Sequence, residues 1–180
     1  MPQTINPRNQ SCRHHPIASR EARAAAFTLV EIMVTITIIS LLAAAAIPAL
    51  QAVKRKTLAA TVANDLRTFS SAFDTYAHEM GGWPAEVAAG VVPPEMINRI
   101  KAPAWTRVTP AGGQYNWDYK QIHAGTRYTA AIAISSTALS PVNLDPDLLL
   151  AIDRLIDDGN LATGNFFLGA DGEPVYIVAQ

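Results

Sequence analysis

The hydrophobic pattern of the chain begins with one long apolar run. From Phe27 to Leu50 the only charged residue is Glu31. A helix rises about 1.5 Å per residue, and about 20 apolar residues cross a hydrocarbon layer of about 30 Å. We therefore predict a membrane-spanning helix over residues 27–50. A carboxylate inside such a helix is costly, so Glu31 either has a partner or lies at the interfacial edge of a plain membrane anchor.

After residue 50 the pattern changes to that of an amphipathic helix. Apolar residues recur at steps of three and four, at Leu58, Val62, Leu66, Phe69, Phe73, Tyr76 and Met80. This spacing places them on one helix face. The sequence Gly81-Gly82-Trp83-Pro84 then predicts a stop, because glycine favours helix ends and proline cannot extend a helix. We expect the helix to continue over 51–82, with Pro48 inside it.

Residues 83–180 are expected to form a small α+β head. Strands are predicted at 115–119, 128–134, 166–168 and 175–178, and short helices at about 94–101 and 146–158. Turns are expected at Ala124-Gly125 and at 169–172, and Asp145 before Pro146 is typical of a helix N-cap. The predicted fold class is α+β, with a long amino-terminal helix packed on a small antiparallel sheet.

The segment before the apolar run is basic and ends in small residues. It carries Arg8, Arg13, Arg20 and Arg23 but one acid, Glu21. A secretory signal places its apolar segment before the cleavage site, whereas here Ala24-Ala25-Ala26 precede the apolar segment. A cut after Ala26 would leave the helix on the mature protein, with a new ammonium at Phe27 one helical turn from Glu31. In a bundle of identical helices, the ammonium of one copy could pair with the carboxylate of the next.

The sequence Ala26-Phe27-Thr28-Leu29-Val30-Glu31, followed by an apolar helix with Pro48, resembles the processing motif of type IV pilins and pseudopilins. The resemblance covers about residues 24–56. It implies that a prepilin peptidase cuts between Ala26 and Phe27 and that Phe27 is N-methylated. It also implies that Glu31 is the assembly carboxylate and that Pro48 bends the helix. Ala26 departs from the usual glycine, so we expect cleavage to persist at a lower rate.

Composition excludes a basic nucleic-acid binder. The chain has 14 basic and 15 acidic residues, and residues 1–26 hold four of the basic and one of the acidic ones. The remainder therefore carries a net charge of about −4, which predicts no nucleic-acid partner. The one cysteine, Cys12, lies in the leader, so the mature chain would have no disulfide.

The resemblance also implies a location and a set of partners. The leader would be cytoplasmic and the carboxy-terminal domain periplasmic, with one pass through the bacterial inner membrane. Charge alone does not fix this orientation, because Lys54-Arg55-Lys56 balance the leader arginines. Expected partners are a prepilin peptidase, other pilin or pseudopilin subunits, further copies of the chain, the inner-membrane assembly platform and membrane lipid. The expected division is 1–26 leader, 27–50 membrane and assembly helix, 51–82 amphipathic helix and 83–180 head.

An enzyme is not expected. After residue 26 the chain has two histidines, His78 and His123, and no cysteine, Gly-rich phosphate loop or nucleophile elbow. The aromatic residues Trp105, Tyr115, Trp117 and Tyr119 could stack a ligand. Packing within the core is the commoner role of such groups.

The main expectation is that the protein binds no cofactor. Calcium is the one cofactor that the residues suggest. Asp157, Asp158, Asp171 and Glu173 supply hard oxygen ligands in loops, and Ca²⁺ takes six to eight of these. The same residues are also typical of helix ends and turns. Both readings stay open at the level of sequence.

The predicted function is therefore mechanical. The chain would be processed by prepilin peptidase and polymerised into a type II secretion pseudopilus or a type IV pilus. The alternative is a membrane-anchored periplasmic ligand-binding or enzymatic domain that does not polymerise. The alternative predicts an uncleaved anchor, tolerance of Glu31→Ala, and a ligand bound by the aromatic residues.

Overall fold

The computed structural model describes residues 28–123, 126–169 and 171–180. The chain divides after Leu42 into two compact units, and the second unit contains Ala43–Gln180. The helices are α1 (Leu29–Met80), a 3₁₀ turn η1 (Pro94–Met96), α2 (Ala102–Thr106) and α3 (Pro146–Ile156). The strands are β1 (Gln114–Tyr119), β2 (Ile122–His123), β3 (Thr126–Arg127), β4 (Ala130–Ser135), β5 (Phe166–Leu168) and β6 (Pro174–Ala179).

The long amino-terminal helix is confirmed as a single element of 52 residues. Pro48 lies inside it. The helix ends where the sequence predicts: Gly81 adopts a φ of 73°, and its N–H donates to the carbonyl of Ala77 at 2.9 Å. This left-handed conformation is one that glycine adopts without a steric penalty.

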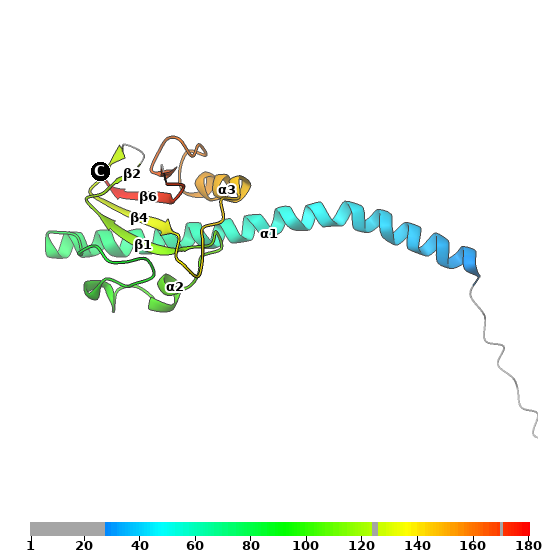
Figure 1. Cartoon of the computed structure of the whole chain (residues 1–180), viewed down its shortest axis with the longest axis horizontal. Coiled ribbons are helices and arrows are strands. Elements are labelled where there is room, and N and C mark those ends of the chain that lie inside the picture. Colours follow the sequence, from blue (N-terminus) through cyan, green and yellow to red (C-terminus); the bar gives the residue numbers. More distant parts are fainter. Residues whose placement is uncertain (1–27, 124–125, 170) are drawn as a thin grey trace, which may run out of the picture. The chain divides into compact units, whose positions relative to one another are not determined.

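The predicted antiparallel sheet is also confirmed. Its four strands lie in the order β1-β4-β6-β5, and every pair is antiparallel. Strands β1, β4 and β6 lie along the carboxy-terminal half of α1 (Figure 1). Strand β5, at one edge, has only three residues. At the other edge, the carbonyl of Tyr115 in β1 accepts a hydrogen bond from Gly90 at 2.8 Å.

The core lies between α1 and one face of the sheet. Phe69 and Phe73 on α1 are buried against Trp105, Tyr115 and Trp117. The Phe73 and Trp117 rings stack with centroids 3.8 Å apart. Each indole N–H has a partner, since Trp105 donates to the carbonyl of Val91 and Trp117 to that of Pro84. These aromatic residues therefore pack the core rather than form an exposed ligand platform.

The opposite face of the sheet has a smaller apolar cluster of its own. Its members are Tyr128, Ala131, Ala133, Phe167, Val175 and Ile177. Every residue of β4 is buried, because its alternate side chains enter the two clusters. The sheet is thus covered on both faces along this strand.

Helix α3 begins as predicted. The Asp145 carboxylate accepts a hydrogen bond from the N–H of Asp147 at 3.1 Å, with Pro146 in the first turn. A side-chain acceptor at this position satisfies a backbone N–H that the helix leaves without a partner. The helix ends at Ile156, two residues before the expected end.

Two expectations for local structure are wrong. The apolar stripe of α1 ends before Met80, whose side chain is 61% exposed. The predicted helix over 94–101 is a single 3₁₀ turn. Lys101 adopts an extended conformation with a ψ of 101° and precedes α2. Pro103 favours the first turn of a new helix, so the helical residues fall after Lys101 rather than before it.

Candidate assembly helix and head-domain sites

The amino-terminal end of α1 is capped by its own sequence. The hydroxyl of Thr28 accepts a hydrogen bond from the N–H of Glu31 at 3.2 Å. Thr28 and Glu31 have the three-residue spacing of a capping box, and an acid in the first turn is favoured by the helix dipole. Glu31 therefore has a local structural role besides the assembly role that the resemblance implies. The sequence prediction missed Thr28, although the spacing of a capping box was visible.

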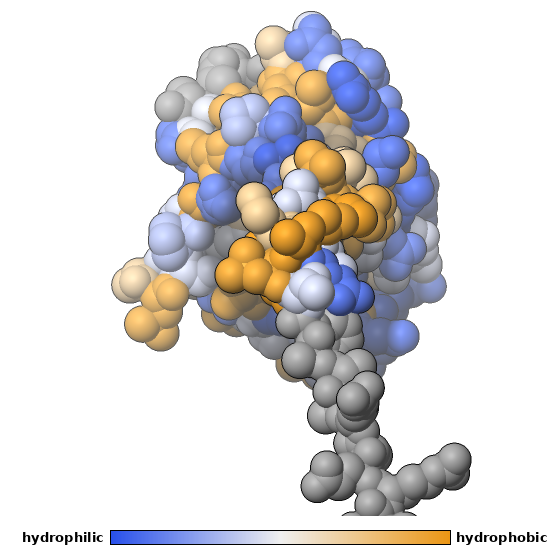
Figure 2. Space-filling model, turned by 90° about the vertical axis from the view of Figure 1, so that its right-hand side faces the viewer, coloured by the Kyte–Doolittle hydropathy of each residue, from blue (hydrophilic) through white to orange (hydrophobic). Residues whose placement is uncertain are grey.

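The first part of α1 exposes apolar side chains along its length. Every described residue from 28 to 57 is exposed, and many apolar residues lie at the surface (orange in Figure 2). Within the described residues, α1 is the one helix whose length and composition would allow it to cross a membrane. The exposed face includes Leu29, Ile32, Met33, Ile36, Ile39, Leu42 and Leu50.

The few hydroxyl groups in this apolar part bond within the helix. Thr35 donates to the carbonyl of Ile32 at 2.8 Å, and Thr37 to that of Met33 at 2.7 Å. Ser40 makes the same kind of bond at 2.7 Å. A polar group satisfied inside its own helix can face lipid at low cost. From Thr28 to Leu50, α1 is therefore compatible with a hydrocarbon environment except at Glu31, the one charged residue of this stretch.

The predicted processing residues lie partly outside the described part of the chain. Ala26 and Phe27 precede the first described residue, Thr28. Glu31 is exposed in the first turn of α1, and Pro48 is exposed near the end of the apolar run. The roles proposed for these four residues remain predictions.

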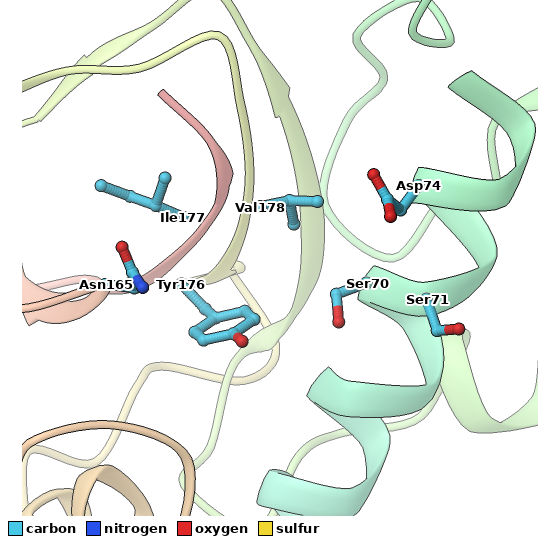
Figure 3. Close-up of a pocket in the computed structure, with 7 residues that line it drawn as sticks. All are labelled: Ser70, Ser71, Asp74, Asn165, Tyr176, Ile177 and Val178. Atoms are coloured by element: carbon cyan, nitrogen blue, oxygen red, sulfur yellow. The ribbon is translucent and has the colours of Figure 1, made fainter. Parts of the chain in front are cut away.

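The head has a polar hollow between α1 and the sheet. Its volume is about 330 Å³, and Figure 3 shows Ser70, Ser71 and Asp74 on α1 opposite Asn165, Tyr176 and Val178. Ser70 donates to the carbonyl of Arg67 at 3.1 Å, and Asp74 lies 3.7 Å from the Nε2 atom of His78. These hydroxyl, amide and carboxylate groups could hydrogen-bond a ligand. The described lining offers no nucleophile paired with a base.

The predicted histidines do not contribute a site within the described side chains. His78 is exposed on the last turn of α1, beside Asp74. The side chain of His123 lies outside the described residues. Tyr119, the least buried of the aromatic residues singled out, lies beneath the ammonium of Lys120 at 4.8 Å from the ring centroid.

The four predicted calcium ligands divide into two groups. Asp157 and Asp158 lie together at the end of α3, where Asp153 joins them. Glu173 instead accepts hydrogen bonds from the hydroxyl of Ser135 at 2.6 Å and the N–H of Ser136 at 2.9 Å. Asp171 accepts one from the N–H of Glu173. The acid that the sequence prediction missed, Asp153, could have been recognised by its spacing of four from Asp157, which places both on one helix face.

A tight electrostatic contact joins α1 to the segment before the sheet. The Asp65 carboxylate accepts hydrogen bonds from Arg107 and, at 2.9 Å, from the hydroxyl of Tyr115. Burial raises the pKa of Tyr115, and the Asp65 carboxylate raises it further. The hydrogen bond to Asp65 also raises the pKa of Arg107. This contact secures the fold, because both partners of the carboxylate are donors that stay protonated.

Comparison with known proteins identifies the amino-terminal segment. Neither the curated proteins nor the solved structures gave a match. The prokaryotic N-terminal methylation motif matches residues 22–47, which include Glu31 and the first part of α1. That motif fits a protein anchored in the inner membrane by one helix, and it indicates a structural subunit. Residues 22–47 thus carry the amino-terminal signature of type IV pilins and pseudopilins.

Proposed function

We propose that the chain is a filament subunit of a type II secretion pseudopilus or a type IV pilus. A prepilin peptidase would cut between Ala26 and Phe27 and methylate Phe27. The mature subunits would then assemble through α1. The observation that carries this proposal is the methylation motif at 22–47 on a helix whose described residues up to 57 are all exposed.

The exposed apolar part of α1 supports assembly as well as anchoring. Outside a membrane these side chains need another cover, since large exposed apolar surfaces mark interaction sites. Helices of neighbouring copies would provide that cover. A contact between two different surfaces of the same chain repeats without closing and gives an open helical filament.

Glu31 would guide this assembly by its charge. An ammonium at Phe27 of one copy would pair with the Glu31 carboxylate of its neighbour, and this pairing would offset the cost of a carboxylate among apolar groups. The capping bond from the Glu31 N–H to Thr28 involves the backbone. It therefore leaves the carboxylate available for a neighbouring subunit.

The first experiment is intact-mass and amino-terminal analysis of the protein from native membranes, with and without the prepilin peptidase. We expect a mature chain that starts at N-methylated Phe27 and disappears without the peptidase. An intact leader, or a cut beyond Leu50, would contradict the proposal. An intact leader would favour a membrane-anchored periplasmic ligand-binding or enzymatic domain, whose ligand the polar hollow beside Tyr176 could accept. A cut beyond Leu50 would remove the anchor and favour a secreted domain.

The second experiment tests the charge of Glu31. We expect Glu31→Gln to be processed and inserted normally but to enter filaments several-fold less, as measured by cross-linking of sheared filament fractions. Asp74→Asn is the matched control, because it removes an exposed carboxylate from the same helix. Normal incorporation of Glu31→Gln would exclude the pairing mechanism while leaving the processing result intact.

A further inference from the structure

Helices α1 and α3 lie side by side in the head (Figure 1), and an apolar hollow opens between them. Its volume is about 300 Å³, and its apolar lining consists of Ala59, Ala60, Ala151 and Leu155. Leu155 is 43% exposed, and Ala60 is exposed as well. The folded head therefore leaves this apolar surface uncovered.

Two basic side chains line the same hollow, Lys56 on α1 and Arg154 on α3. Both are exposed, and neither forms an ion pair with an acidic residue that the structure describes. Arg55 differs from both, because it pairs with Asp145 and Asp147. Long basic side chains lay their apolar stems along a surface and keep their charges in water. The hollow thus combines an apolar lining with a positively charged rim.

The acids that follow Arg154 in the sequence bond to their own loop. The carboxylate of Asp158 accepts hydrogen bonds from the N–H of Asn160 at 2.8 Å and from the hydroxyl of Thr163 at 2.6 Å. The carboxylate of Asp157 accepts hydrogen bonds from two backbone N–H groups of the same loop. These bonds keep both carboxylates with the loop, so the guanidinium of Arg154 stays available for an outside anion.

The position of the hollow along α1 places it at the depth of lipid headgroups. Lys54 is the first charged residue after Glu31, and it marks the end of the uncharged stretch. Residues 56–60, which line the hollow, lie within about 9 Å of Lys54 at helical rise. The polar layer outside the hydrocarbon core of a membrane is about 5–8 Å thick on each side. A membrane crossed by α1 would therefore bring its phosphate groups to the rim of the hollow.

The charge of the rim is opposite to that of the chain as a whole. The residues after 26 carry a net charge of about −4, so a negatively charged membrane would repel most of the head. Lys56 and Arg154 are a local exception at the one place where a membrane would approach. A planar guanidinium can also hold two oxygen atoms of one phosphate at once.

We propose that this hollow binds an anionic phospholipid of the membrane that α1 crosses. The lipid phosphate would lie between the ammonium of Lys56 and the guanidinium of Arg154. The upper part of one acyl chain would cover the apolar lining. Such a contact would hold α3 and the head against the membrane surface. The inference depends on anchoring by α1 and does not require that the chain form filaments.

The test measures which lipids the full chain retains in neutral detergent. Native mass spectrometry counts the bound lipids after addition of equal amounts of phosphatidylglycerol, which is anionic, and phosphatidylcholine, which has no net charge. We expect retention of phosphatidylglycerol to exceed that of phosphatidylcholine at least about fivefold, because one basic side chain near an anionic surface strengthens binding by about that factor. Equal retention of the two lipids would overturn the proposal.

A soluble headgroup separates a lipid site from a phosphate site. Glycerol 1-phosphate has the charge of the lipid but no acyl chain. We expect it not to displace phosphatidylglycerol when both are present at the same concentration. Displacement at equal concentration would show that the hollow binds free phosphate groups, which would overturn the assignment to a lipid.

Charge variants assign the binding to the rim of the hollow. Lys56→Gln and Arg154→Gln change exposed side chains and should each lower the preference for phosphatidylglycerol about fivefold. Lys54→Gln is the matched control, because it removes the same charge from α1 two residues earlier, on a different helix face, and Lys54 does not line the hollow. It should keep the preference of the native chain. An equal loss in Lys54→Gln and Lys56→Gln would indicate general attraction to charge near the membrane and would overturn the proposal.

A further variant tests the hollow itself. Ala60→Phe fills the space from an exposed position and leaves both basic side chains in place. We expect it to lose the selective retention of phosphatidylglycerol while its near-ultraviolet circular dichroism stays native. Native retention by Ala60→Phe would show that the lipid does not enter the hollow. Cleavage after Ala26 and filament formation do not enter these measurements, so a failure of the proposed function would leave their outcome unchanged.

Discussion

Asp65 is a charged residue on the buried side of α1. Its side chain is only 12% exposed, and Arg107 and Tyr115 both donate to it. Removing the carboxylate leaves the Tyr115 hydroxyl buried without an acceptor. Such a loss costs about 1–3 kcal/mol, so a single residue decides a large share of the stability of the head.

We expect Asp65→Ala to lower the free energy of unfolding by about 2–3 kcal/mol. Urea denaturation of the full chain in detergent, followed by tryptophan fluorescence, measures this loss. Asp74→Ala is the control, because its carboxylate is exposed on the same helix, and it should cost less than about 0.5 kcal/mol. A loss for Asp65→Ala no larger than that of the control would show that the contact does not stabilise the fold.

Tyr115 is expected to lower the folding stability of the head as the pH rises into the alkaline range. Its pKa is raised by burial and by the Asp65 carboxylate, so above pH about 10 the unfolded chain loses a phenol proton that the folded chain keeps. Unfolding then becomes more favourable as pH rises, by up to about 1.4 kcal/mol per pH unit. We expect Tyr115→Phe to reduce this alkaline slope in denaturation curves collected from pH 9 to 11.5. A slope equal to that of the native chain would contradict the assignment.

At the scale of elements, a bridge between α1 and the start of α3 fixes both helices. Arg55 lies 3.3 Å from the carboxylate of Asp145 and 2.9 Å from that of Asp147. Asp145 also caps α3 through the N–H of Asp147. The same carboxylate therefore starts one helix and attaches it to another.

We expect Asp145→Ala to destabilise the head by about 1–2 kcal/mol, mostly through the lost cap. Asp147→Ala removes only an exposed ion pair and should cost less than about 1 kcal/mol. Thermal unfolding at low and at 0.5 M salt separates the two terms, because salt weakens the ion pair and leaves the cap intact. Equal losses in the two variants would show that the cap does not stabilise α3.

Periodicity predicted α1 and the strands at 115–119 and 128–134 from the sequence. Cap and turn residues predicted α3 and the last two strands. The hydrophobic pattern did not predict burial or side-chain roles that depend on contacts between distant parts of the sequence. Met80 continues the spacing of the stripe, but its side chain is exposed. Asp65 and Asp153 occupy core positions that a hydrophobic pattern does not reveal. Their roles depend on Arg107, Tyr115 and the loop at 157–166, which the fold brings together from distant parts of the sequence.

At the scale of the whole molecule, all the buried residues that the structure describes belong to one unit. The first of them along the chain is Ala59. Leu58 is half-buried and packs against the core, but every described residue up to Thr57 is exposed and contributes nothing to the core of the head. Folding of the head and burial of the amino-terminal part of α1 are therefore separate events.

We expect a chain that starts at Lys54 to fold without detergent. It keeps Arg55 and every described core residue, so its near-ultraviolet circular dichroism should match that of the full chain in detergent. Its unfolding midpoint should lie within a few degrees of that of the full chain. Loss of the near-ultraviolet signal would mean that residues before 54 support the core.

The short edge strand β5 limits how the sheets of neighbouring heads can pair when the heads are crowded together. Strand β5 presents only three residues at one side of the sheet, and on the β1 side the carbonyl of Tyr115 is already bonded to the N–H of Gly90. A sheet edge that offers few free backbone groups gives a foreign strand little to pair with. Many heads could therefore be held at very high local concentration without fusing into a continuous β-structure, and their contacts would remain reversible.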